Sequence, residues 1–257
     1  MFLNQENISR TSTFKLSIAA ISISVFFLTF PANAQQSSED LHNLIDTAWE
    51  YQLETKPIFA TIIGVEKYNN QLPEFSVEAQ QQQLRQRQTF LDKLHVINRS
   101  TLSDEDKLNY DMFELHQKRH INKIRHKSYL IPITSFLGFH ITFAQLPSYM
   151  PLKTVDNYSD YVSRLQSFQN YVQQHITVMN KGLKKGYTLP KVIAKNVPST
   201  VKSLIVDDPT THPLYQPFKK MPQQIEENTK KQLRQKAQSA IDSSVIAGYK
   251  SFPYLSY

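Results

Sequence analysis

Apolar residues recur at steps of three and four between Tyr158 and Leu183, and this pattern constrains the fold more than any other feature of the sequence. Such spacing gathers the apolar side chains on one face and predicts an amphipathic helix of about seven turns. The chain of 257 residues has only five glycines, and its other long segments between prolines also show helical rather than alternating patterns. The residues expected to face the core are Tyr158, Tyr161, Val162, Leu165, Phe168, Val172, Ile176, Met179 and Leu183.

Three further helices are expected. One runs from Ser76 to about Asn98 with leucines inward and glutamines and arginines outward. Another begins after Ser103, a good N-cap residue followed by three carboxylates that complement the helix dipole, and a third begins near Pro222, since proline suits a first turn. The residues expected to face the core are Leu84, Leu91, Leu94 and Ile97 in the first of these helices, Leu108, Met112 and Leu115 in the second, and Ile225, Leu233, Ala237 and Ile241 in the third. The predicted fold is all-α, a bundle of long amphipathic helices.

Two proline-rich connections separate these helices, over residues 132–151 and 198–222. Each is too long for a simple turn, so both are candidate groove-forming loops. Gly138 and His140 in the first are candidate groove residues, although a loop histidine is more often solvated or packed. No internal repeat or low-complexity linker divides the chain, so residues 35–257 are expected to form a single helical domain.

Residues 1–34 have the organisation of a secretory signal peptide. A start with two basic residues precedes an apolar run over residues 16–30, and alanines occupy both small positions of an A-x-A cleavage site. Cleavage is expected between Ala34 and Gln35, which would export the mature protein to the periplasm or the extracellular space. The apolar run is shorter than the roughly 20 residues that span a bilayer, so no transmembrane segment is expected after signal removal; an uncleaved anchor is the alternative.

The chain is basic, with a formal net charge of +7. Such an excess is compatible with nucleic-acid binding. The basic residues are spread among acidic ones, however, and the sequence has no aromatic-basic RNA motif or helix-turn-helix signature. Export also separates the protein from nucleic acid, so nucleic acid is not an expected partner. The chain has no cysteine, and its stability must therefore come from the core without disulfides.

The segment HQKRHINKIRH carries histidines at positions 116, 120 and 126. His116 and His120 are four residues apart and would share one face of a helix, as the two zinc ligands of an H-E-x-x-H motif do. The glutamate position holds Gln117, whose amide cannot act as a general base, and the surrounding lysines and arginines would repel a dication. The segment is predicted to be an exposed basic helix face, with no metal ligand and no catalytic residue assigned in this chain.

Five segments carry a resemblance to a known family. They are KPIFATIIGVEKYNNQLPEFSVEA (56–79), TLSDEDKLNYDMFEL (101–115), PITSFLGFH (132–140), the run from TVDNYSDYV to KVIAKNV (154–197) and HPLYQPF (212–218). Together they resemble the N-terminal half of the bacterial exported proteins called domain of unknown function 885. The resemblance implies a largely helical fold related to zinc-dependent peptidases, and hence a peptide-like substrate. The family's metal motif, a His-Glu pair followed by Pro-Gly-His-His, lies in the C-terminal half.

This chain has neither a His-Glu nor a Pro-Gly dipeptide. Zinc is therefore expected only in full-length members, and the chain is expected to form an incomplete half of a larger zincin-like fold that is inactive alone. Its partners would be a peptide-like substrate or the missing C-terminal half. Two alternatives are a non-catalytic helical binding or scaffold protein of the cell envelope, and an independent metalloenzyme built on His116, His120 and a further ligand.

Aromatic residues crowd the end of the sequence. If the second half of the family fold is missing, these side chains would lack part of their packing partner, and an exposed apolar patch is expected there. The residues concerned are Tyr249, Phe252, Tyr254, Leu255 and Tyr257.

Overall fold

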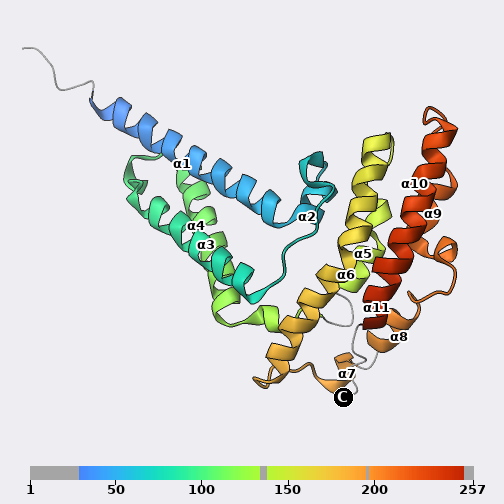
Figure 1. The fold of residues 1–257 in the computed structure, drawn as a ribbon. Helices are drawn as coiled ribbons and strands as arrows, with labels where there is room; N and C mark the ends of the chain where they lie inside the picture. Colours follow the sequence, from blue (N-terminus) through green and yellow to red (C-terminus); the bar gives the residue numbers. More distant parts are fainter. Residues whose placement is uncertain (1–28, 134–137, 195–196, 252–257) are drawn as a thin grey trace, which may run out of the picture.

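The computed structural model describes residues 29–133, 138–194 and 197–251, which form helices without a β-strand (Figure 1). The all-α class is therefore confirmed over this part of the chain, and none of its helices is long and apolar enough to cross a bilayer. The long helices are α1 (Thr29–Thr55), α3 (Val77–Val96), α4 (Asp104–Arg125), α6 (Val155–Leu183) and α10 (Glu227–Ala240). The shorter ones are α2 (Pro57–Ile62), α5 (Phe139–Ala144), α7 (Lys191–Ala194), α8 (Val197–Lys202), α9 (Gln216–Lys219) and α11 (Ala247–Ser251).

Side-chain caps fix the beginnings of three long helices. Ser76 and Ser103 each accept a hydrogen bond from the backbone N–H three residues later, at 3.0 and 3.1 Å. Thr154 and Asn157 form a capping box at the start of α6. These contacts satisfy N–H groups that have no partner in a first helical turn. The starts predicted at Ser76 and Ser103 are confirmed.

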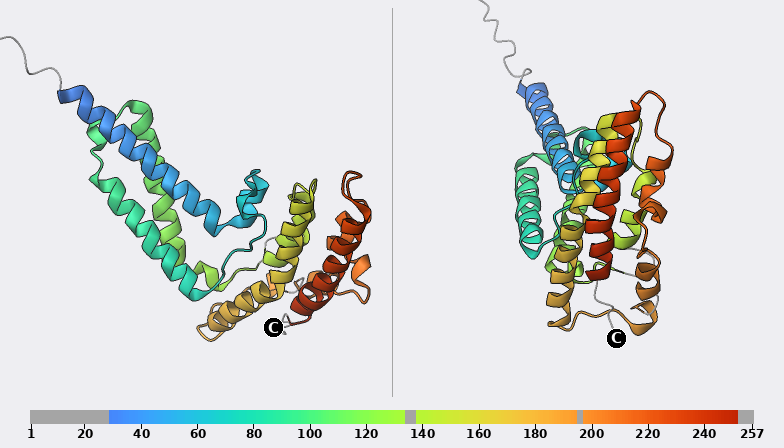
Figure 2. Two further views of the ribbon diagram at one scale, coloured as in Figure 1. Left: turned by 45° about the horizontal axis from the view of Figure 1, so that its top comes forward. Right: turned by 45° about the vertical axis from the view of Figure 1, so that its right-hand side comes forward.

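The helices pack as two bundles set at an angle to each other (Figure 2). In the first, α1, α3 and α4 enclose a core of Leu41, Leu44, Ala48, Phe90, Leu91, Leu94, Leu102, Tyr110 and Ile121. In the second, α6 packs against α10, α11 and the π-helical segment Ile241–Ile246 between them. The predicted seam of α6 is buried in this second core from Tyr158 to Met179, and Leu183 is half-buried.

The two bundles are joined at Arg164 of α6, whose side chain is fully buried. Its Nε donates to the carbonyl oxygen of Gln71 at 2.8 Å. Its Nη2 donates to the carbonyl oxygens of Pro57 and Tyr68, both at 3.0 Å, and to Thr61 Oγ1 at 2.7 Å. Arg164 thereby ties α6 to the segment that connects α1 with α3.

Helix α4 presents a different face to the core from the one predicted. The expectation that Leu108, Met112 and Leu115 face inward is wrong, because their side chains are 62%, 59% and 51% exposed. The buried positions of α4 are Asp106, Tyr110, Gln117, Ile121 and Ile124.

Polar contacts to both neighbouring helices fix the rotation of α4. Asp106 accepts hydrogen bonds from Ser38 Oγ at 2.6 Å and pairs with His42 at 2.8 Å, both on α1. Gln117 Oε1 accepts from Arg87 Nη1 on α3 at 3.0 Å. Buried polar groups require partners, so these pairs outweigh the apolar stripe on the opposite face. Arg87 is only 2% exposed, and the prediction that the arginines of α3 face outward is wrong at this position.

The C-terminal helix begins later than predicted. Helix α10 starts at Glu227, and Pro222 belongs to the turn that precedes it. Beyond Ala240 the chain remains helical through the π-helical segment and α11. The four inward positions are nevertheless buried as predicted: Ile225, Leu233, Ala237 and Ile241.

The proline-rich connections, predicted as candidate groove-forming loops, contain short helices. Helix α5 lies in the first, and α8 and α9 lie in the second. Phe143, Leu146 and Phe218 from these segments are completely buried in the second core. The apolar residues among the prolines therefore act as core residues of the second bundle.

The expectation that Tyr249 forms part of an exposed apolar patch is also wrong. Tyr249 is 1% exposed, and its hydroxyl donates to the carbonyl oxygen of His140 at 3.1 Å. The remaining residues of the predicted C-terminal patch lie outside the described residues: Phe252, Tyr254, Leu255 and Tyr257.

Candidate binding groove between α1 and α4

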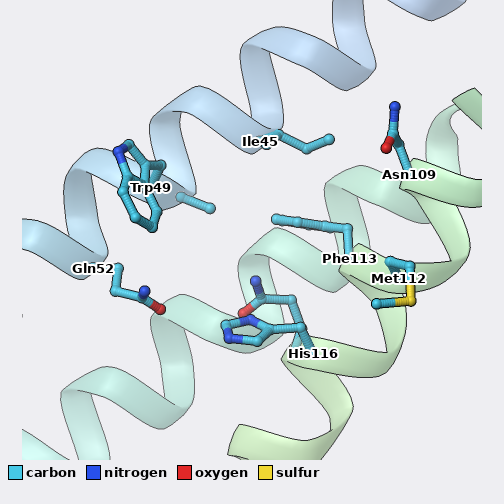
Figure 3. A pocket seen from close by; sticks show the side chains of 9 residues that line it. Ile45, Trp49, Gln52, Asn109, Met112, Phe113 and His116 are labelled. Carbon is cyan, nitrogen blue, oxygen red and sulfur yellow. The ribbon is translucent and has the colours of Figure 1, made fainter. Parts of the chain in front are cut away.

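A groove of about 300 Å³ lies between α1 and α4. Trp49 of α1 and Met112 of α4 line it and are 44% and 59% exposed, and Phe113 reaches from α4 toward α1 (Figure 3). Ile45 and Ala48 complete the apolar wall. The groove exists because α4 turns the side of the helix that carries Met112 away from the core.

One end of the groove is polar. Gln52 of α1 and His116 of α4 lie there (Figure 3), and Gln117 contributes its amide. His116 is exposed and Gln117 is buried, so the helical segment predicted as an exposed basic face is exposed in part. Asn109 of α4 lies at the other end, so the groove combines an apolar wall with polar side chains at both ends (Figure 3).

Of the predicted histidine pair, His116 lines this end, and His120 lies one turn further along α4, with the two ring centroids 4.6 Å apart. Burial, followed by the positive charges of Arg87 and Lys56, lowers the pKa of His116 and lowers that of His120 to about 3. Both rings are therefore neutral at pH 7. Lys123 on the next turn of α4 adds a further positive charge.

These residues do not fit the zinc ion that the family resemblance implies for full-length relatives. Across residues 29–133, 138–194 and 197–251, no three histidine, aspartate or glutamate side chains are grouped so as to hold a metal ion. The histidine pair is surrounded by cations, which would raise the energy of a bound dication. No step of a metal-dependent reaction can be assigned to this groove.

Arg87 lies behind the polar end of the groove. Its Nη1 donates to Gln117, whereas Nε and Nη2 have no hydrogen-bond partner among the described residues. Burial lowers the pKa of Arg87, but a guanidinium remains charged at neutral pH. A buried positive charge that no acidic side chain compensates is energetically costly.

Lys56 extends this cationic cluster toward solvent. It follows α1 directly, is half-buried, and has its pKa lowered to about 8 by burial and by the charges of Arg87 and Lys123. Lys56, Arg87 and Lys123 therefore surround the two neutral histidines, and of these five residues His116 lines the groove.

The residues singled out from the sequence lie elsewhere. Gly138 precedes α5, and His140 is 1% exposed within α5, where burial lowers its pKa to about 4. His140 is thus a core residue of the second bundle. Ala34 and Gln35 lie within α1, and cleavage between them stays a prediction.

Trp49, Lys56 and Arg87 were not predicted as site residues. Arg87 did leave a signal, because it lies three residues after Leu84 and four before Leu91 and therefore on the apolar face of α3. A charged residue on a predicted core face requires a specific explanation. The position of Trp49 opposite α4 depends on tertiary packing and leaves no comparable pattern in the sequence.

Replacing Arg87 with methionine should raise the free energy of unfolding by about 1–2 kcal/mol, because an apolar side chain of similar length would replace an uncompensated buried charge. Urea denaturation measures the change. Arg85→Met on the exposed face of the same helix serves as control and should change stability by no more than about 0.5 kcal/mol. A clear destabilisation by Arg87→Met would show that Arg87 has a structural role.

The fold is similar to that of a longer bacterial protein. A crystal structure of a protein described as a "putative lipoprotein" from Colwellia psychrerythraea matches with a TM-score of 0.67 and 15% sequence identity. The match covers 86% of this chain and 40% of that one, so this chain spans less than half the length of its structural relative.

None of the curated proteins compared with the chain is a significant match. The family described as "Bacterial protein of unknown function (DUF885)" matches residues 57–254, from α2 to beyond α11. Because this match covers well over half of the sequence, the chain belongs to the DUF885 family of bacterial proteins.

Proposed function

We propose that this chain is a non-catalytic binding module of the bacterial cell envelope and corresponds to the N-terminal part of a zinc-peptidase-like fold. The α1–α4 groove is the observation that carries this proposal. It is open to solvent, has an apolar wall and carries a few polar side chains, and the cations around the neighbouring histidine pair do not fit a metal ion. Concave apolar sites with a few convergent polar groups are typical of ligand binding.

The exposed stripe of α4 supports a scaffold role beside the groove. Leu108, Met112 and Leu115 are all more than half exposed on one helix face. Apolar residues gathered on one face in this way favour contact with another polypeptide. In a longer relative, further helices would cover such a face, and the 40% coverage of the related structure is consistent with this role.

An envelope location rests on two observations. The related protein from Colwellia psychrerythraea is described as a "putative lipoprotein", and residues 1–34 of this chain have the pattern of a signal peptide. Expression of the full chain in a bacterial host, followed by fractionation and N-terminal sequencing, should place the protein outside the cytoplasm with Gln35 first. Retention of Met1 in the envelope fraction would contradict cleavage and favour an uncleaved anchor.

The purified protein should bind less than about 0.1 equivalent of zinc after incubation and dialysis, because cations surround its histidine pair. It should not hydrolyse a mixed peptide library. The His116→Ala/His120→Ala variant should retain its stability within about 1 kcal/mol, since neither residue is fully buried.

Elemental analysis and mass-spectrometric peptide profiling provide the measurements. One equivalent of zinc that disappears in the double variant would overturn the non-catalytic assignment and support a metalloenzyme. Peptide cleavage that persists in the presence of a chelator would also overturn the non-catalytic assignment, because it would be a metal-independent activity.

A further inference from the structure

The outer face of α4 carries an apolar stripe at helical spacing. Its members, Leu108, Met112 and Leu115, are separated by steps of four and three and are all more than half exposed. The buried residues of α4 lie on the opposite side of the helix, which packs against α3 and α1. The stripe is therefore accessible to another polypeptide, and contiguous apolar surface of this kind marks interaction sites.

Charge is segregated along the same helix. From Asp104 to Glu114, α4 has five acidic residues and one basic residue, and from Leu115 to Arg125 it has four basic residues and no acidic one. A copy of α4 placed alongside in the same direction would bring like charges together. An antiparallel copy would bring the acidic half of each helix against the basic half of the other, and the two helix dipoles would also oppose each other favourably.

Two exposed residues of opposite charge bracket the stripe. Glu105 precedes Leu108 by three residues and Arg119 follows Leu115 by four, so both continue the row of the stripe. They are 14 residues apart, about 21 Å along the helix, and cannot pair with each other. Across the described part of the chain neither forms an ion pair, whereas other charged side chains of α4 do. Each is free to pair with a charge on another molecule.

We propose that the α4 stripe is the interface of a symmetric homodimer, in which two copies of α4 pack antiparallel about a two-fold axis beside Met112. Positions at matching distances from the axis meet in such a pair, so Leu108 faces the partner's Leu115 and Glu105 faces the partner's Arg119. Two ion pairs thus close the two ends of the apolar contact. The dimer rests on the proposed scaffold role and names its partner as a second copy of this chain.

The size of the stripe sets the strength of the contact. From Glu105 to Arg119 it spans about four helical turns, which places the interface at the small end of specific protein interfaces. We therefore expect a dimer that dissociates in the micromolar range. Charge complementarity selects the antiparallel pairing, because the parallel one places like charges opposite each other.

Sedimentation velocity tests for the dimer. The mature protein should show a monomer–dimer equilibrium with a dissociation constant of roughly 1–100 µM. Met112→Glu should abolish the dimer, because it places two carboxylates beside the axis. Val96→Glu makes the same kind of change at an exposed apolar residue of α3 and should leave the dissociation constant unchanged. Circular dichroism establishes that each variant is folded.

Charge reversal tests the identity and direction of the partner. Glu105→Arg and Arg119→Glu should each weaken the dimer at least about fivefold at low salt, because each creates two like-charge pairs. The double variant Glu105→Arg/Arg119→Glu should restore the dissociation constant to within about twofold, since the opposite charges meet again across the axis. A parallel pair would not show this restoration.

Introduced cysteines test the position of the axis, because the chain has none of its own. Met112→Cys should form a disulfide-linked dimer under mild oxidation, since the two copies of this position meet at the axis. Gln81→Cys, exposed on α3, should not be cross-linked under the same conditions.

Several results would overturn the proposal. These are a protein that stays monomeric at about 0.5 mM, a dimer that persists in Met112→Glu, a double charge reversal that does not restore affinity, or equal cross-linking of the two cysteine variants. Such a failure leaves the zinc and peptidase predictions untouched. Peptidase activity in a protein that still dimerises through α4 would overturn the non-catalytic assignment alone.

Discussion

Replacement of Arg164 with methionine should lower the free energy of unfolding by about 3–5 kcal/mol. The guanidinium is fully buried, and burial lowers its pKa to about 10, so it is charged in the folded protein at pH 7. Methionine would leave the carbonyl oxygens of Pro57 and Tyr68 without these donors in a buried setting. The loss should be largest at the junction of the two bundles, because these carbonyls belong to the segment between α1 and α3.

Urea denaturation followed by circular dichroism measures this loss. Hydrogen exchange of the segment from α2 to the start of α3 should increase in Arg164→Met before the protein unfolds globally. Arg87→Met is a matched comparison, since both residues are buried arginines and only Arg164 has its Nε and Nη2 satisfied. Equal effects of the two substitutions would contradict the distinction between an arginine whose buried donors are satisfied and one whose Nε and Nη2 are not.

Acidification from pH 6.5 to pH 4 should remove at least about 5 kcal/mol of stability, the share of two buried histidines alone. Burial lowers the pKa of both His140 and His175 from an ordinary value of 6.5 to about 4. The unfolded chain therefore binds protons in this range that the folded protein does not bind, and stability falls as the pH falls. The difference corresponds to about 3 kcal/mol for each buried histidine, and all of this stabilisation is present above pH 6.5.

The contribution of His175 to this pH dependence can be isolated by replacing His175 with phenylalanine. His175 stacks on Phe75 and packs against the tilted ring of Phe139, with ring centroids 3.9 and 4.0 Å away, so His175→Phe should retain these ring contacts. The average slope of stability against pH between 6.5 and 4 should fall by about 1 kcal/mol per pH unit. His126→Phe at the exposed end of α4 should leave the slope unchanged. An unaltered slope in His175→Phe would assign the acid sensitivity to other groups.

Part of the candidate site could be predicted from the sequence. The pairing of His116 with His120, its helical setting and its cationic neighbours follow from spacing within one short segment. Arg87 and Lys56 could not be placed beside that pair, because they lie 29 and 60 residues before His116 in the chain. Their proximity results from the packing of α1 and α3 on α4, which no local pattern encodes.

The sequence alone determined the all-α class, the starts of α3 and α4 and the buried face of α6, because capping and apolar periodicity are local properties that act within a few residues. The tertiary structure decided which face of α4 is buried. Periodicity identifies residues that share a face, but only the partners Asp106 and Gln117 find on α1 and α3 select the inward one. The exposed Leu108–Leu115 stripe, the groove beside Trp49 and the unsatisfied edge of Arg87 all follow from that selection, since each depends on contacts between segments far apart in the chain.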